Sequence, residues 1–227
     1  MSRIVIVGGH GKVALLLAPL LAGRGDQVVS LIRDPAQSGD VTAAGAEPLV
    51  LSVEEAGVGE LTQAFEGADA VVWSAGAGGK GGPERTDAID RVAAIRSMEA
   101  AAAAGVRRYV MVSFIGSHGE IAEDHPLLAY ALAKIAADRH LQTTDLDWTI
   151  LGPGLLTLDE PTGRITLGRA VDGIGANYPT SRANVAAVIA AALTDDRTIG
   201  KVIPFSDGDV PIAEALADVP AEFADLS

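Results

Sequence analysis

The chain has 227 residues, of which 48% are hydrophobic and 21% charged, a balance typical of a globular protein with a sizeable core. It carries 17 basic against 30 acidic residues, a formal net charge of −13, which disfavours nucleic acid and anionic membranes as partners. The absence of cysteine excludes disulfides and thiolate metal sites. The sequence shows no signal peptide and no apolar run long enough to span a membrane, so we expect a cytoplasmic protein.

Short apolar runs alternate with helix-like segments along the chain. The predicted strands are Ile4–Val7, Val28–Ile32, Leu49–Leu51, Ala70–Trp73, Tyr109–Ser113, Trp148–Leu151 and Lys201–Phe205. The predicted helices are Val13–Ala22, Leu61–Glu66, Thr86–Ala104, Leu127–Gln142, Ser181–Leu193 and a short one from Pro211. The strands are apolar on both faces, as strands of a parallel sheet beneath helices should be. The alternation predicts an α/β fold with a doubly wound parallel sheet.

We expect residues 1–227 to form one domain, because no linker and no repeat interrupts this pattern. The composition changes after Gly152, where the segment GPGLLTLDEPTGRITLG is rich in turn residues. We therefore expect residues 152–227 to form a small lobe on the substrate side of the sheet. At the start of the helix in this region Arg182 can bind an anion, although we favour a structural ion pair for it.

The first predicted strand runs directly into a glycine turn, IVIVGGHGKVALLL. Gly8, Gly11 and Ala14 have a spacing that lets a chain turn tightly, approach a pyrophosphate and pack a helix against a strand. The helix that follows offers free N–H groups and a partial positive charge to phosphates. A Walker-type site is excluded, because Val13 stands where a magnesium-binding Ser or Thr belongs. We favour dinucleotide binding over a purely structural turn.

The second predicted strand ends in LIRDP, at the position where dinucleotide folds discriminate between cofactors. An acid at this tip accepts hydrogen bonds from the ribose 2′-hydroxyl of NAD, whereas an arginine meets the 2′-phosphate of NADP. Arg33 therefore favours NADP, and Asp34 keeps NAD open. The alternative for Arg33 is an ordinary solvated charge.

Tyr130 and Lys134 lie four positions apart in HPLLAYALAKIAADRHLQTT, so they share one face of the predicted helix. A lysine ammonium beside a tyrosine lowers the pKa of the phenol, which lets the phenol exchange a proton while hydride moves. The pair therefore indicates an acid/base site.

Six segments occur in one order across most of the chain: GGHGKVA, LIRDP, AVVWSAG, GVRRYVMVSFIG, YALAKIAADRHLQTTDLDWTILGPG and SRANVAAVIAAAL. Together they resemble the atypical short-chain dehydrogenase/reductase group, the NAD(P)-binding, NmrA-like relatives of the extended reductases and epimerases. The resemblance implies a Rossmann fold in which Tyr130 and Lys134 are the proton-transfer pair. The cofactor-binding residues that it implies are Gly8, Gly9, His10, Gly11, Lys12, Val13, Arg33, Ser52, Ala75, Gly76, Tyr130, Lys134 and Pro153. We expect no metal site, because the two loop histidines His118 and His125 lack a third ligand.

The chain departs from the family pattern after the fifth predicted strand. The resemblance implies a catalytic serine just beyond that strand, but Phe114 and Ile115 occupy the two places in question. Ser113 and Ser117 are the possible substitutes, and we take Ser113 as the candidate catalytic hydroxyl. Ser52 likewise stands where the family often has an aspartate near the adenine.

These features support two functions. The first is an NADP-dependent oxidoreductase, with NAD possible, that transfers hydride to a small carbonyl or quinone-like acceptor. The second is a non-catalytic NADP(H)-binding redox sensor whose altered serine position reflects lost catalysis. An epimerase or dehydratase is disfavoured, because such relatives usually carry a longer substrate lobe. We expect a monomer or weak homodimer that binds a nicotinamide dinucleotide and an unidentified small molecule, but neither nucleic acid nor a membrane.

Overall fold

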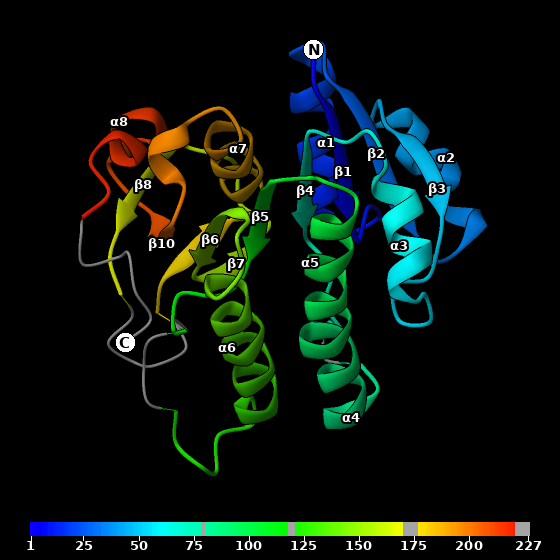
Figure 1. Ribbon diagram of the computed structural model, residues 1–227. Helices are drawn as coiled ribbons and strands as arrows, with labels where there is room; N and C mark the ends of the chain where they lie inside the picture. The colour runs from blue at the N-terminus through cyan, green and yellow to red at the C-terminus, as the bar shows by residue number, and fades with distance from the viewer. Residues whose placement is uncertain (79, 118–120, 170–176, 221–227) are drawn as a thin grey trace.

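The computed structural model, drawn in Figure 1, describes residues 1–78, 80–117, 121–169 and 177–220. Within these ranges, nine strands form one sheet. In spatial order they are β11 (Val210–Pro211), β8 (Arg164–Leu167), β10 (Lys201–Asp207), β6 (Asp147–Pro153), β5 (Arg108–Val112), β4 (Ala70–Trp73), β1 (Arg3–Val7), β2 (Gln27–Ile32) and β3 (Glu47–Val50). From β10 to β3 every neighbouring pair is parallel. The predicted α/β fold with a doubly wound parallel sheet is confirmed.

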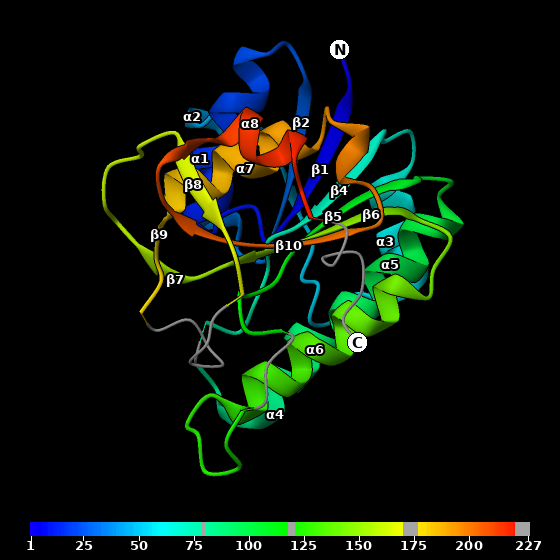
Figure 2. The same ribbon diagram turned by 90° about the vertical axis from the view of Figure 1, so that its left-hand side faces the viewer.

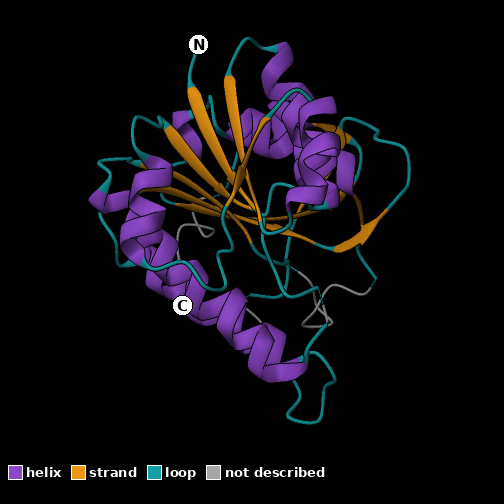
Figure 3. Ribbon diagram, turned by 90° about the vertical axis from the view of Figure 1, so that its right-hand side faces the viewer, coloured by secondary structure: helices purple, strands orange, loops and turns teal. Residues whose placement is uncertain are grey.

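Helices cover both faces of this sheet, as Figure 3 shows. One face carries α3 (Val58–Phe65), α5 (Ala94–Ala103) and α6 (Leu128–Gln142). The other carries α1 (Lys12–Gly23), α2 (Ser38–Ala43), α7 (Arg182–Ala192) and α8 (Ile212–Ala217). Side chains alternate along each strand, so Val5 and Val7 of β1 pack toward the first group of helices and Ile4 and Ile6 toward the second. Burial on both faces explains why the strands are apolar throughout.

The order of the strands reverses at β1. This strand pairs with β2 on one side and with β4 on the other, and the two halves of the sheet extend outward from there. The connections that leave the two central strands diverge at such a point, and ligands of these folds bind in the resulting crevice at the carboxyl ends of the strands. The glycine turn after β1 and the loop after β4 therefore border the expected binding region.

The C-terminal region adds short strands that the sequence pattern did not predict. β8 runs antiparallel to β10, and β11 runs antiparallel to β8. Beside the main sheet, β7 (Leu155–Thr157) and β9 (Pro179–Ser181) form a separate parallel pair, visible in Figure 2. These strands are too short to show a period in the sequence. A small C-terminal region of mixed strand direction thus flanks the parallel sheet.

The predicted helix Thr86–Ala104 differs from expectation in its middle. It begins as α4 (Gly82–Thr86), continues as the π-helical segment η2 (Asp87–Ala93) and ends as α5. π-helical turns are rare and frequently occur at functional sites. The remaining predicted helices and strands are confirmed to within a few residues, and two 3₁₀ turns, η1 (Pro35–Gln37) and η3 (Asp196–Thr198), complete the described elements. Among the described residues no helix has the length and apolar character needed to cross a membrane.

Candidate functional site

The glycine turn packs closely against β2 and against the loop that follows β4. Gly8 has a φ of +84°, and a Cβ at this residue would lie 2.7 Å from Ala75 Cα. A Cβ on Gly9 would lie 2.4 Å from Ser30 Cβ. At Gly11, the N-cap of α1, the nearest atom to an added Cβ is the Gly8 carbonyl oxygen at 3.1 Å. Within the turn the tightest packing therefore falls on the two adjacent glycines, Gly8 against the loop after β4 and Gly9 against β2.

Two cavities meet at this turn. The larger, of about 650 Å³, extends to α6 and is here called the α6 cavity. The smaller, of about 580 Å³, extends to the ends of β2 and β3 and is called the β2 cavity. The residues that line both are Gly11, Lys12, Ser74, Ala75, Gly76, Gly78 and Arg182. The two cavities therefore form one cleft along the carboxyl edge of the sheet, with its midpoint at the start of α1.

The β2 cavity is positively charged in a chain whose net charge is −13. Among the described residues its only acidic lining residue is Glu54, which binds Arg85 with a distance of 3.0 Å between Arg85 Nη2 and Glu54 Oε2. The basic residues that line it are Lys12, Arg33, Lys80, Arg85 and Arg182. The first turn of α1 has no side-chain cap, so among the described residues its N–H groups find no acceptor and remain for a ligand in the cleft. The cavity is therefore suited to an anionic ligand.

At the carboxyl end of β2, Arg33 lines this cavity and Asp34 does not. Arg33 lines the cavity, and no side-chain hydrogen bond holds it within the described part of the chain. Asp34 does not line the cavity, because its Oδ1 accepts a hydrogen bond from the Ala36 N–H, at 2.9 Å, and caps η1. The two residues that sequence reasoning left as rivals are thus separated by their local structure.

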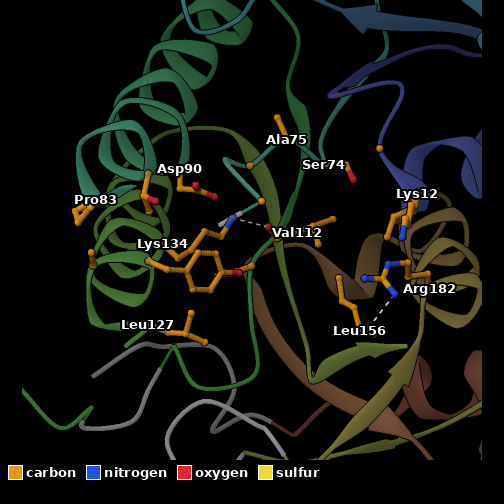
Figure 4. A pocket seen from close by; sticks show the side chains of 18 of the residues that line it. Lys12, Ser74, Ala75, Pro83, Asp90, Val112, Leu127, Lys134, Leu156 and Arg182 are labelled. Carbon is orange, nitrogen blue, oxygen red and sulfur yellow. Dashed lines mark hydrogen bonds between the residues drawn. The ribbon is translucent and has the colours of Figure 1, made fainter. Parts of the chain in front are cut away.

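The α6 cavity is lined by the predicted Tyr130 and Lys134, and Asp138 continues the same face of α6 behind them. Lys134 is 2% exposed, and its Nζ donates a hydrogen bond of 2.6 Å to the Val112 carbonyl oxygen (Figure 4). The hydroxyl of Ser113 binds Asp138 Oδ2. Burial raises the pKa of Asp138 to about 6, although the Lys134 ammonium and the Ser113 hydroxyl oppose that rise. Asp138 was not among the predicted site residues.

The pKa of Tyr130 shifts in the direction opposite to the prediction. Burial raises it, and the carboxylates of Asp90 and Asp138 raise it further. The prediction was wrong because it placed the Lys134 ammonium beside a phenol with no competing anions. In the structure that ammonium bonds a carbonyl oxygen and lowers the pKa of both carboxyl groups. Tyr130 is therefore a protonated phenol at neutral pH, which is the form that donates a proton.

Asp90 is a second buried acid that sequence reasoning missed. It is 2% exposed, and its Oδ2 accepts a hydrogen bond of 3.0 Å from the Ala77 N–H. A Cβ on Gly76 would lie 2.9 Å from Asp90 Oδ1, so the glycine makes room for the carboxylate. Burial raises the pKa of Asp90. The signal was present in the sequence, since Asp90 lies on the same helical face as the buried Thr86 and Ala93.

Ser113 is better placed than Ser117 to act in the α6 cavity. Ser113 lines the cavity and Ser117, although buried, does not. Phe114, at one of the places where the family resemblance implies a hydroxyl, packs its ring against that of Tyr130 with 5.6 Å between ring centroids. The chain thus has an aromatic contact to the tyrosine where a hydrogen-bond donor was expected.

Most of the other predicted residues line the cleft. The predicted cofactor-binding residues in its lining are Gly8, His10, Gly11, Lys12, Val13, Arg33, Ser52, Ala75, Gly76, Tyr130 and Lys134. Gly9 and Pro153 line neither cavity: Gly9 packs on Ser30, and Pro153 pairs with Phe205 at the end of β6. In the described part of the chain no group of three or more potential ligands forms a metal site.

A parallel sheet with this switch point, a glycine turn in the first βα unit and a cationic cleft above it define a Rossmann-type dinucleotide-binding protein. Comparison with known families agrees, since a family model described as NAD(P)H-binding matches residues 8–196. The chain belongs to this NAD(P)H-binding family, as its resemblance to atypical short-chain dehydrogenases/reductases implied.

Individual relatives match along almost their whole length. A UPF0659 protein of Schizosaccharomyces pombe is 35% identical, over 96% of this chain and 94% of the relative. The sugar epimerase YhfK of Bacillus subtilis, itself uncharacterised, is 32% identical, over 94% of this chain and 98% of the relative. The solved oxidoreductase ylbE of Lactococcus lactis is 30% identical with a TM-score of 0.82, over 96% of each chain. The chain is thus an NAD(P)-binding protein of the oxidoreductase and epimerase type.

Proposed function

We propose that the protein is an NADPH-dependent reductase of a small carbonyl or quinone-like acceptor, with Tyr130 as the proton donor. The observation that carries the proposal is the continuity of the cleft, in which a cationic cavity and a cavity with a protonated phenol meet at the glycine turn. A dinucleotide that extends through both would have its adenosine end beside Arg33 and its nicotinamide end beside Tyr130.

The preference for NADPH over NADH is argued from the tip of β2. Arg33 lines the cavity and is free to pair with a 2′-phosphate, whereas the carboxylate of Asp34 is engaged in capping η1. A guanidinium binds phosphate through two parallel hydrogen bonds, and a carboxylate in the same place would repel it. The excess of basic residues in the β2 cavity favours the additional negative charge of NADPH.

The residues of the α6 cavity have different roles in the proposed reduction. Bound NADPH would supply the hydride. Tyr130, kept protonated by its buried surroundings, donates its phenolic proton to the acceptor oxygen as that oxygen gains negative charge. Lys134, anchored on the Val112 carbonyl oxygen, places a positive charge behind the tyrosine. Ser113 lines the same cavity, but its hydroxyl donates to Asp138 Oδ2, so Tyr130 is left as the proton donor to the acceptor oxygen.

Apolar side chains complete the wall of this cavity. Pro126, Leu127 and Leu156 line it, and the ring of Phe114 supports Tyr130 from behind the lining. Such a wall excludes water from the acceptor and strengthens the electrostatic interactions inside. It also favours an acceptor with an apolar or aromatic body over a fully hydroxylated one.

The test is a titration of purified protein with NADPH and with NADH, followed by nicotinamide fluorescence, in wild type and Arg33→Ala. We expect wild type to bind NADPH more tightly, and Arg33→Ala to lose about tenfold or more in NADPH affinity while NADH affinity changes little. Arg164→Ala is the matched control, because this arginine lies outside the cleft and donates to the Asp209 carbonyl oxygen. Absence of binding by either nucleotide, or tighter binding of NADH, contradicts the proposal.

A non-catalytic NADP(H) sensor is the second candidate, and the position of Phe114 favours it. A sensor would bind NADPH as tightly but would oxidise it with none of a panel of aldehydes, ketones and quinones. The name of the Bacillus subtilis relative raises a third, sugar epimerisation, and the near-equal lengths remove the argument that a short substrate region disfavours it. An epimerase would convert a nucleotide sugar with no net oxidation of added NADPH.

A further inference from the structure

Arg182, the first residue of α7, is held in an unusual way for a cleft arginine. Its Nη1 donates to two backbone carbonyl oxygens of β7, at 2.9 Å to Leu156 and 2.8 Å to Thr157. The described part of the chain gives it no acidic partner, so the structural ion pair predicted from the sequence is not found there. The two carbonyl bonds fix the guanidinium without neutralising its charge.

The free side of this guanidinium faces the middle of the cleft. Within the described residues Nε and Nη2 have no hydrogen-bond acceptor, so N–H donors remain for a ligand. Arg182 is the only described residue after Pro153 that lines both cavities, and Lys12 is the only other charged residue that does so. Figure 4 shows Lys12 and Arg182 on one side of the α6 cavity, with Asp90 and Lys134 on the other.

We propose that Arg182 binds the diphosphate of the dinucleotide, together with Lys12 and the first turn of α1. This inference rests on the proposed cofactor. A dinucleotide that extends through both cavities has its diphosphate near its midpoint, and the midpoint of this cleft is the zone that the two cavities share. An anionic group on the acceptor would occupy only the α6 cavity, whereas Arg182 also lines the β2 cavity. A guanidinium and an ammonium match the two negative charges of a diphosphate.

The same contact connects the C-terminal region to the cofactor. The carbonyl groups that anchor Arg182 belong to β7, and Leu156 of this strand also lines the α6 cavity. Dinucleotide binding through Arg182 therefore stabilises the wall against which the acceptor packs. In this way a residue outside the glycine turn makes acceptor binding depend on a loaded cofactor.

The test measures the affinity of wild type, Arg182→Ala and Arg182→Lys for NADPH and for adenosine 2′-monophosphate, which lacks the diphosphate. We expect Arg182→Ala to lose about 10- to 100-fold in NADPH affinity, with a smaller loss in Arg182→Lys. Affinity for adenosine 2′-monophosphate should change less than threefold, about the scatter of such titrations. Arg33→Ala, by contrast, should weaken both ligands.

Salt dependence separates a charge contact from a merely structural role. If Arg182 meets the diphosphate, NADPH affinity should fall less steeply with salt in Arg182→Ala than in wild type, because one charge contact has been removed. NADPH affinity equal to that of wild type, or an unchanged salt dependence, overturns the inference. Failure of wild type itself to bind NADPH overturns the proposed function instead, so the two failures are distinguishable.

Discussion

The two cavities of the cleft use charge in different ways. In the β2 cavity the charges sit on exposed side chains such as Arg33 and Lys12, which come from the turn after β1 and the tip of β2. Around Tyr130, beyond the residues that the two cavities share, the charges are buried: Lys134 and Asp90 line the α6 cavity and are each 2% exposed, and Asp138 behind them is fully buried. The β2 cavity thus presents cations to an incoming anion, whereas an ammonium and two carboxyl groups are buried around the phenol of the α6 cavity.

This difference indicates which part of the cleft is suited to binding a phosphate and which part is suited to proton transfer. Solvated cations attract a phosphate without large changes in their own protonation, because water screens them. Burial shifts protonation instead, as the raised pKa of Asp138 and of Tyr130 shows. Substitutions in the β2 cavity should therefore act on affinity, and those in the α6 cavity on rate or on pH dependence.

The largest effect is expected for Tyr130→Phe. The variant keeps the ring that packs against Phe114 but removes the proton donor, so NADPH oxidation by an active acceptor should slow about 100- to 10,000-fold. NADPH affinity, read from nicotinamide fluorescence, should stay within about threefold, since the charges of the β2 cavity are untouched. Equal loss of NADPH affinity and rate would contradict this division between binding and chemistry, because Tyr130 would then act in cofactor binding.

The next effect concerns the buried carboxyl group of Asp138. Its pKa is raised from 3.8 to about 6, so the folded state holds a proton that the unfolded state releases. The stabilisation from this proton is complete below about pH 4 and is lost as pH rises through about 6. Wild type should therefore lose about 2–3 kcal/mol of unfolding free energy relative to Asp138→Asn across this window, at about 1.4 kcal/mol per pKa unit.

Denaturant unfolding of both proteins from pH 4 to pH 7.5 measures this difference. Asp195→Asn serves as a control with no expected pH dependence in this window, because hydrogen bonding to Arg197 lowers the pKa of Asp195 below its usual value of 3.8. The contribution of Asp195 is present above its unfolded pKa and is lost as pH falls, and it is small because the pair lies at the surface. A pH-independent difference between wild type and Asp138→Asn would show that Asp138 stays ionised throughout.

The strands and loops that form the β2 cavity could be predicted from the sequence. These strands are continuous apolar runs, and the residues after them, from Gly8 to Val13 and at Arg33, lie consecutively in short motifs. Such motifs depend on local geometry, so spacing alone predicts that these residues lie together, and most of them line the cleft. Which of Arg33 and Asp34 lines the cavity could not be predicted, because it depends on the cap that Asp34 forms on η1.

The residues around the α6 cavity could be predicted only in part. The spacing of Tyr130 and Lys134 placed both in one cavity. The pKa of Tyr130, however, is raised by burial and then by Asp90, which lies in a π-helical segment 40 residues earlier, and by Asp138. The bond between Ser113 and Asp138 joins residues 25 positions apart. Arg182 is held in the cleft by hydrogen bonds to β7, a strand too short to show an alternation of apolar and polar residues in the sequence. Contacts of this kind are set by packing between distant segments, which single-sequence patterns do not contain.

The smallest expected effect separates fold from binding within the glycine turn itself. Gly9 lies in the predicted cofactor motif but lines neither cavity, and an added Cβ would lie 2.4 Å from Ser30 Cβ. Gly9→Ala should therefore lower the unfolding free energy by about 2 kcal/mol through overpacking. Gly59→Ala, at an exposed position of α3 with no atom within 4 Å of the added Cβ, should be neutral or slightly stabilising. If Gly9→Ala kept its stability and lost NADPH affinity, Gly9 would contact the ligand like the glycines beside it, and its packing on Ser30 would not be its main role.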